Sequence, residues 1–251
     1  MTDPGSQTSR FDGLPREIGA LCRVVQGVLL HSDWIAAYGL PASHLGPGAR
    51  DTLPLSRRLV QIADADARPL TVARAANVRA IGTCRDDALM LCGILRQQEI
   101  PARIRCGFAA YLVADRWEDH WICEYRLPGE SRWRQADAQI DDLLRQRLAI
   151  QFDTADLPPN RFVAAGDAWR LCRTAQADPA KFGHGTAQGL WFMRVNVVRD
   201  HFALNESETS VWDSWRQDSR KLVSDADKAA TDLIARDPGQ AKVDVAPPWL
   251  A

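Results

Sequence analysis

The stretch that decides the fold is IGTCRDDALMLCGILRQQ, which spans residues 81–98. It predicts a helix from Cys84 to about Gln98, because apolar residues recur at steps of three and four. Acidic residues in the first turn suit its partial positive charge, and Pro101 beyond the end cannot continue the helix. The apolar face consists of Cys84, Ala88, Leu91, Cys92 and Leu95. The sequence therefore places a cysteine at the start of an amphipathic helix.

The start of a helix is a position at which a thiol becomes a nucleophile. The first turn has unpaired backbone N–H groups and a partial positive charge, and both stabilise a thiolate. The same N–H groups can donate hydrogen bonds to the oxyanion that forms on a carbonyl under attack. The alternative for Cys84 is inert packing, because a free cysteine behaves as a small hydrophobic residue.

Three strands are predicted after this helix. In the second strand, alternation puts Trp121, Cys123 and Tyr125 on one face. The opposite face carries His120, Ile122 and Glu124. The predicted strands span 103–112, 120–126 and 132–137, and a turn spans 127–130.

The register of the last two strands decides what His120 can do. A four-residue loop pairs Arg126 with Ser131, and counting back along both strands sets His120 directly opposite Asp137. Directly opposed residues have Cβ atoms about 5 Å apart, so the carboxylate would orient an imidazole that acts as a base. A bulge at the turn would change this pairing. The alternative is an ordinary histidine beside a charged neighbour.

Three groups of residues, in this order, resemble the core of the transglutaminase-like superfamily, in members of bacterial type. They are residues 81–88 with 94–96 and 100–103, residues 119–121, and residues 133–138. The resemblance covers residues 77–142, about a quarter of the chain. It implies a papain-like α+β core in which the helix that carries the nucleophile packs on an antiparallel sheet. It also implies a catalytic triad of Cys84 as nucleophile, His120 as base and then acid, and Asp137 as orienting residue.

The whole chain is therefore expected to have an α+β fold. We predict an N-terminal helical segment over 1–76, the catalytic core over 77–142, and a mostly helical C-terminal extension over 143–251 within the same domain. Apolar periodicity predicts helices over 14–39 and 56–64 in the N-terminal segment.

Composition restricts the class of protein. The 251 residues have a formal net charge of −1 and no long run of Lys or Arg, which argues against a nucleic-acid partner. The apolar runs are too short to span a bilayer, and the N-terminus lacks the pattern of a signal peptide. We therefore expect a cytoplasmic protein with no membrane partner. The six cysteines have no paired spacing, which favours free thiols.

No cofactor and no metal are expected. Asp64-Ala65-Asp66 alternates as a calcium loop begins, but Pro69 stands where that loop has glycine, and Ala75 where it has glutamate. The cysteines lack the Cys-x-x-Cys pairs that are typical of zinc sites. Trp34 lies fifty residues before Cys84, so it is not given the oxyanion-stabilising role that a tryptophan has in some family members. The second oxyanion donor stays unassigned.

The predicted reaction is acyl transfer through a thioester, by a cysteine-nucleophile hydrolase or acyltransferase. We expect hydrolysis of an amide or ester in a peptide or small molecule, by an amidase or peptidase. Two alternatives stay open: an amide-forming acyltransferase of a biosynthetic pathway, which uses an amine acceptor, and a non-catalytic binding module on the same fold. The substrate-binding residues are unknown from the sequence.

Several other residues have weaker signals. Arg85 and Arg103 are suited to binding a carboxylate, although arginines with no specific role on the surface are more common. Residues 183–185 read as a flexible turn. An aromatic set late in the chain is expected in the core, with closure over a substrate as the alternative; it consists of Trp191, Phe192, Trp212 and Trp215.

Overall fold

The computed structural model describes residues 1–51, 53–205 and 223–240. Its helices and strands form an α+β fold, as predicted. The chain divides into two compact units, each built from two segments. The first unit consists of Met1–Ile104 with Ile122–Leu157, and the second of Arg105–Trp121 with Pro158–Ala251.

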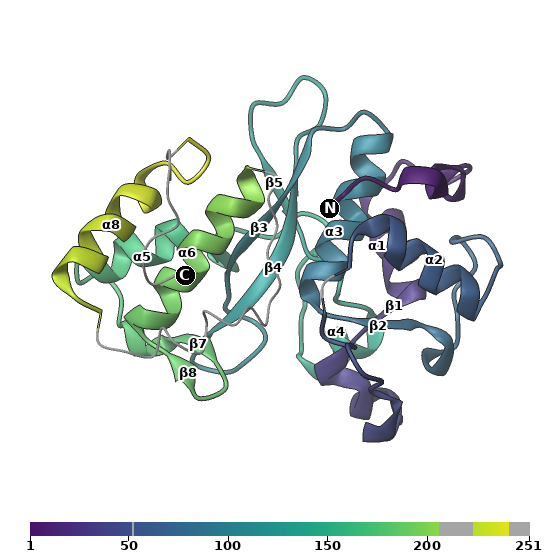
Figure 1. Ribbon diagram of the computed structural model, residues 1–251, viewed down its shortest axis with the longest axis horizontal. Helices are drawn as coiled ribbons and strands as arrows, with labels where there is room; N and C mark the ends of the chain where they lie inside the picture. The colour runs from purple at the N-terminus through teal and green to yellow at the C-terminus, as the bar shows by residue number, and fades with distance from the viewer. Residues whose placement is uncertain (52, 206–222, 241–251) are drawn as a thin grey trace. The chain divides into compact units, whose positions relative to one another are not determined.

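The first unit is built around the helix that the sequence predicted, α3 (Cys84–Gln97), which is buried along most of its length. Helices α1 (Ile18–Val28) and α2 (Leu55–Ala65) pack against it (Figure 1). A Cβ on Gly93 of α3 would lie 2.1 Å from the Leu55 side chain, so glycine permits the close approach of α2. The remaining described helices of this unit are α4 Asp142–Arg147 and the 3₁₀ segments η1 Gly5–Phe11, η2 Ser32–Tyr38, η3 Ala42–His44 and η4 Ala76–Val78.

The helix predicted over 14–39 is correct only in its first half. Helix α1 ends at Val28, and the next residues form strand β1 (Leu29–His31), parallel to β2 (Ala80–Gly82). A short apolar run fits a buried strand as well as a helix, and here the pairing with β2 decides between them. In that pairing His31 lies beside Gly82, two residues before Cys84.

Strands β4 (Trp117–Tyr125) and β5 (Arg134–Ala136) form the predicted antiparallel hairpin, but the predicted register is wrong by two residues. Cys123 pairs with Ala136, so the register continues to Ile122, rather than His120, opposite Asp137. A shift of two residues keeps every side chain of β4 on its predicted face, because the side-chain period of a strand is two.

The loop of this hairpin is longer than four residues because Trp133 leaves the ladder. The guanidinium groups of Arg103 and Arg126 lie over its indole ring, 4.0 and 5.4 Å from the ring centroid. Arg134 also reaches back into the turn, where its Nη2 donates to Glu130 Oε1 at 2.6 Å. Side-chain contacts therefore close the loop in place of two further ladder pairs.

The middle of α3 packs against β4. Burial raises the pKa of the Cys123 thiol well above its usual value, and the neighbouring Cys92 thiol of α3 raises it further. The face of β4 that carries Cys123 is thus the one that meets the middle of α3.

The second unit combines strands with three described α-helices, α5 (Ala165–Arg173), α6 (Leu190–Leu204) and α8 (Asp225–Arg236), which pack on one another (Figure 1). It also contains the 3₁₀ segment η5 (Pro179–Lys181). Its core contains the aromatic residues Phe108, Trp169, Phe182 and Phe192. Of the late aromatic set, Phe192 lies in this core and Trp191 packs against it, as expected. Trp212 and Trp215 lie outside the described residues.

The described part of the extension after residue 143 contains short strands besides the helices. Three short strands occur there, β6 (Phe162–Ala164), β7 (Phe182–His184) and β8 (Ala187–Gln188). The larger sheet has the order β6–β3–β4–β7–β8, with β5 also on β4, where β3 is Ala102–Ala109. Strand β7 runs parallel to β4, so the sheet is mixed rather than fully antiparallel.

Candidate active site

Cys84 is the first residue of α3, and its side chain is half-buried. Strand β2 ends at Gly82, and Thr83 is an extended residue between the strand and the helix. The predicted start of the helix at Cys84 is confirmed. The backbone N–H groups of the first helical turn therefore lie next to this thiol.

The Asp86 carboxylate fixes the geometry of this turn. Its Oδ2 accepts hydrogen bonds from the Thr83 backbone N at 2.8 Å and from Thr83 Oγ1 at 3.1 Å. A Cβ on Gly82 would lie 2.9 Å from Asp86 Cβ, so the chain needs glycine here to bring Asp86 close. The residues on both sides of Cys84 are thus held together by one side chain.

Arg58 of α2 holds this carboxylate in turn. Its Nη2 lies 2.6 Å from Asp86 Oδ1, and its Nη1 donates to the Ile81 carbonyl at 2.7 Å. Both side chains are at most 3% exposed. The ion pair is therefore buried and joins α2, the end of β2 and the first turn of α3.

Asp137 also belongs to the first unit and is 1% exposed. Its Oδ1 accepts a hydrogen bond from the Gln139 backbone N at 3.0 Å, and its own backbone N donates to the Thr154 carbonyl at 2.8 Å. Burial raises the pKa of the Cys22 thiol, and the nearby Asp137 charge raises it further. The carboxylate is thus fixed directly after β5, close to α1.

His120 lies on β4 within the second unit and is 1% exposed. The Tyr111 ring meets the imidazole edge to face, with centroids 6.1 Å apart and planes at 83°. The two acidic residues before His120 are held by different elements. Glu118 Oε1 lies 2.6 Å from His184 Nδ1 of β7, and Asp119 Oδ1 accepts from Asn196 Nδ2 of α6 at 2.7 Å.

The predicted site residues are thus divided between the units: Cys84 and Asp137 belong to the first and His120 to the second. The residues that contact His120 or the neighbours of Cys84 and His120 were not found from the sequence. Arg58, Tyr111 and Asn196 lie 28, 9 and 77 residues from the residues that they contact. No periodicity or motif marks such distant contacts.

The two arginines that were singled out differ from expectation. Arg85 is fully buried, so it is not a surface arginine. Arg103 donates from Nε to Glu124 Oε2 at 2.8 Å and stacks on Trp133, so it has a structural role within the sheet.

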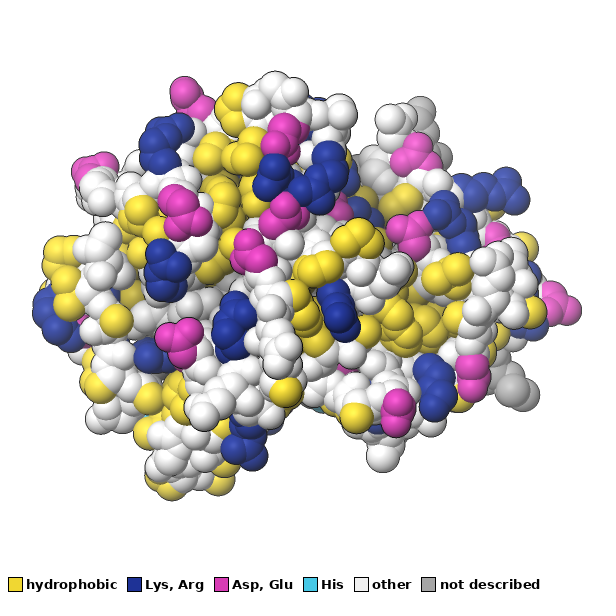
Figure 2. All heavy atoms as spheres, turned by 180° about the vertical axis from the view of Figure 1, so that it is seen from behind, with side chains coloured by type: hydrophobic (Ala, Val, Ile, Leu, Met, Phe, Trp, Pro, Cys, Tyr) yellow, Lys and Arg dark blue, Asp and Glu magenta, His cyan; other side chains and the backbone are white. Residues whose placement is uncertain are grey.

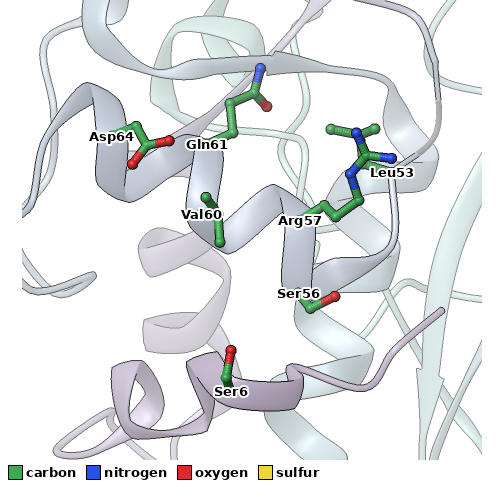
Figure 3. Close-up of a pocket in the computed structure, with 7 residues that line it drawn as sticks. All are labelled: Ser6, Leu53, Ser56, Arg57, Val60, Gln61 and Asp64. Atoms are coloured by element: carbon green, nitrogen blue, oxygen red, sulfur yellow. The ribbon is translucent and has the colours of Figure 1, made fainter.

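A groove of about 550 Å³ lies along α2 (Figure 3). Ser6 of η1 faces the α2 side chains across it (Figure 3). No predicted catalytic residue lines it. Its lining residues are Ser6, Leu53, Ser56, Arg57, Val60, Gln61 and Asp64.

On the face drawn in Figure 2, basic and acidic side chains are interspersed. Among the described residues, no helix has the length and apolar content that a bilayer crossing requires. Within the same residues, no group of three or more His, Cys, Asp or Glu side chains is arranged to hold a metal ion.

Comparison with protein families gives a match to the transglutaminase-like superfamily over residues 57–138. The match contains the helix start at Cys84 and the β4–β5 hairpin. This part of the chain is a transglutaminase-like core. The core begins within α2, earlier than the resemblance from residue 77 indicated, so it includes Arg58. No curated protein and no solved structure gives a significant match to the chain.

Members of the superfamily that residues 57–138 match typically use a cysteine nucleophile for acyl transfer or hydrolysis. The ion pair of Arg58 and Asp86 lies inside the core and holds the first turn of α3.

Proposed function

We propose that the transglutaminase-like core hydrolyses an amide bond in a peptide or small molecule through a thioester on Cys84. His120 acts as the base and then the acid, and Asp137 orients His120. The acyl donor is an amide or ester, and the acceptor is water. An amine acceptor is the alternative.

One observation carries this proposal: Cys84 is the first residue of α3 inside the family match. Thiolates are stabilised by the N–H groups and partial positive charge of a helix start. The buried pair of Arg58 and Asp86 holds this turn in one geometry, which nucleophilic attack requires.

In the proposed reaction, His120 takes the thiol proton and the Cys84 sulfur attacks the carbonyl carbon. The first-turn N–H groups stabilise the oxyanion. The C–N bond then breaks, and the amine leaves with the proton from the His120 imidazolium. In the second step His120 takes a proton from water, which attacks the thioester. The carboxylic acid is released, and the thiol is restored.

The test uses p-nitrophenyl acetate, an activated acyl donor, so that no natural substrate is needed. The wild-type protein should release a burst of nitrophenolate and form an acetyl-enzyme, which peptide mapping locates on Cys84. Cys84→Ala should lose the burst and the acetylated peptide. The matched control is Cys172→Ala, which removes the other half-buried thiol and should leave the burst unchanged.

Retention of the full burst in Cys84→Ala overturns the proposal, because the loss of a covalent nucleophile should cost far more than a factor of ten. Addition of an amine such as methylamine separates the two acceptors. Acetate as the main product supports hydrolysis, and N-methylacetamide as the main product supports the acyltransferase. A protein that is never acylated is a binding module.

A further inference from the structure

Helix α6 contacts β4 on the face opposite to His120. Successive side chains of a strand point to opposite faces, so Asp119 lies on the face of β4 opposite to His120. There Asp119 Oδ1 accepts from Asn196 Nδ2 at 2.7 Å. This contact lies entirely within the second unit.

A third side chain completes the group. Arg199 Nη1 lies 3.7 Å from Asp119 Oδ2 and donates to Asn196 Oδ1 at 3.2 Å. Asn196 and Arg199 are fully buried, and the Asp119 side chain is 8% exposed. Asp119, Asn196 and Arg199 therefore form a closed triangle of polar contacts, which we call the Asp119 triangle.

The chemistry of the Asp119 triangle requires an amide at position 196. Because Arg199 donates to the amide oxygen, the amide nitrogen must point at Asp119, where it supplies the N–H donor that a carboxylate needs. An aspartate at 196 would instead set two carboxylates against each other in a buried place, where like charges repel strongly.

We propose that Asn196 is a positioning residue for His120 that acts through Asp119. Asp119 is the residue directly before His120, so an anchor on its side chain fixes the backbone of β4 at the point from which the imidazole projects. A buried hydrogen bond to a charged group is among the stronger ones in proteins, so it can hold this backbone in one place. The inference rests on the proposed function, in which His120 is the base for Cys84.

The test uses the alkylation of Cys84 by iodoacetamide, which reports the thiolate without a substrate. Rates are measured from about pH 5 to 9 and assigned to Cys84 by peptide mapping. The alkylation rate increases with pH as the thiol ionises, and its midpoint gives the apparent pKa of Cys84. In Asn196→Asp this midpoint should move by one pH unit or more towards the free-thiol value of about 8.5. At neutral pH this corresponds to alkylation about tenfold slower or more.

The exchanged variant N196D/D119N supplies the rescue. It places the amide on β4 and the carboxylate on α6, and Arg199 still lies within reach of both positions. The Asp119 triangle can form again with its roles reversed, so the wild-type alkylation profile should return. Asn196→Leu, which keeps the side-chain size but removes both hydrogen-bonding groups, should shift the profile as Asn196→Asp does.

The control is Asp232→Asn in α8 of the same unit. Trp169 Nε1 donates to Asp232 Oδ1 at 2.7 Å, so this variant also loses a charged acceptor that joins two helices. It should lower the unfolding midpoint without moving the alkylation profile. An equal shift in Asp232→Asn overturns the inference, because the effect would then be a general loss of structure.

The inference also fails if folded Asn196→Asp keeps the wild-type profile. If that variant does not fold, the alkylation profiles of Asn196→Leu and of N196D/D119N decide. The inference fails if Asn196→Leu keeps the wild-type profile, or if N196D/D119N does not restore it. A wild-type protein whose Cys84 reacts like a free thiol contradicts the proposed function itself. If Cys84 is activated in the wild type and its alkylation profile does not change in the Asn196 variants, only the role of Asn196 is contradicted.

Discussion

Arg58 Nη2 and Asp86 Oδ1 lie 2.6 Å apart in a buried ion pair that joins α2 to the first turn of α3. Two charges in a protein interior are costly to desolvate, so this pair is no general source of stability. Its value lies in geometry, because the same carboxylate binds Thr83 and the same guanidinium binds the Ile81 carbonyl. The pair therefore fixes the chain on both sides of Cys84.

Arg58→Met should destabilise the protein by about 3–5 kcal/mol, because it leaves the Asp86 carboxylate buried without its cation. Urea unfolding measures the change. The control is Arg170→Met, which removes one partner of the exposed pair with Asp167 on α5 and should change stability little. An equally small loss in both variants would show that the buried pair is dispensable.

The contrast between α3 and the Arg58 contact shows what a sequence can predict. The helix depends on local signals, namely its apolar periodicity and the acidic residues of its first turn, and its limits are correct within one residue. The pairing of Arg58 with Asp86 depends on how α2 packs against α3, and no sequence pattern near either residue predicts it.

The hairpin shows an intermediate case. Alternation predicted both strands of the hairpin and their faces correctly, because these depend on adjacent residues. The register depended on the length of the loop, and the stacking of Arg103 on Trp133 changed that length. Arg103 lies outside the hairpin, so a count of hairpin residues alone misses its effect.

Cys84 should react with iodoacetamide well before Cys172, although both side chains are half-buried. Burial, with the Asp178 charge as a second cause, raises the pKa of Cys172 to about 11. At neutral pH that thiol is almost wholly protonated, and its thiolate appears only as the pH approaches 11. Peptide mapping after stoichiometric labelling measures the ratio.

The selectivity for Cys84 should therefore be largest near neutral pH and decrease as the pH rises. Cys22 and Cys123 serve as internal references, since burial raises the pKa of both thiols and hides them from the reagent. Labelling of Cys172 at the same rate as Cys84 at pH 7 would contradict an activated nucleophile.

Acid should weaken the attachment of α8. Burial raises the pKa of Asp232, but hydrogen bonds from Arg173 and Trp169 outweigh burial and lower the pKa overall. A lowered folded-state pKa stabilises the protein above the unfolded value of about 3.9, and this stabilisation is lost as the pH falls through the folded value. Urea unfolding at pH 6 and at about pH 3 should show a smaller difference in Asp232→Asn than in the wild type. An unchanged difference would exclude Asp232 as a source of the acid sensitivity.

Gly183 and Gly185 should respond differently to substitution, although both were read as one flexible turn. Gly183 lies in β7, and a Cβ there would be 2.1 Å from the Ala187 carbonyl oxygen of β8. Gly183→Ala should therefore open the β7–β8 hairpin, at a cost of about 1–3 kcal/mol or more. Gly185 has a φ of 55° and no atom within 4 Å of a built Cβ, so Gly185→Asn should fold with little loss. Thermal unfolding compares the two, and equal losses would contradict a strand at Gly183.

His120→Gln should slow the alkylation of Cys84 at neutral pH, and Asp137→Asn should slow it less. Glutamine approximates the size of the buried imidazole but cannot accept the thiol proton, so the thiolate loses its proton acceptor. Asparagine at 137 keeps the side-chain oxygen that accepts from the Gln139 backbone N, yet it removes the charge that stabilises an imidazolium. The burst with p-nitrophenyl acetate should decrease in the same order. If His120→Gln leaves both the alkylation rate and the burst unchanged while the protein remains folded, then His120 is not the base, and the mechanism requires a different proton acceptor for Cys84.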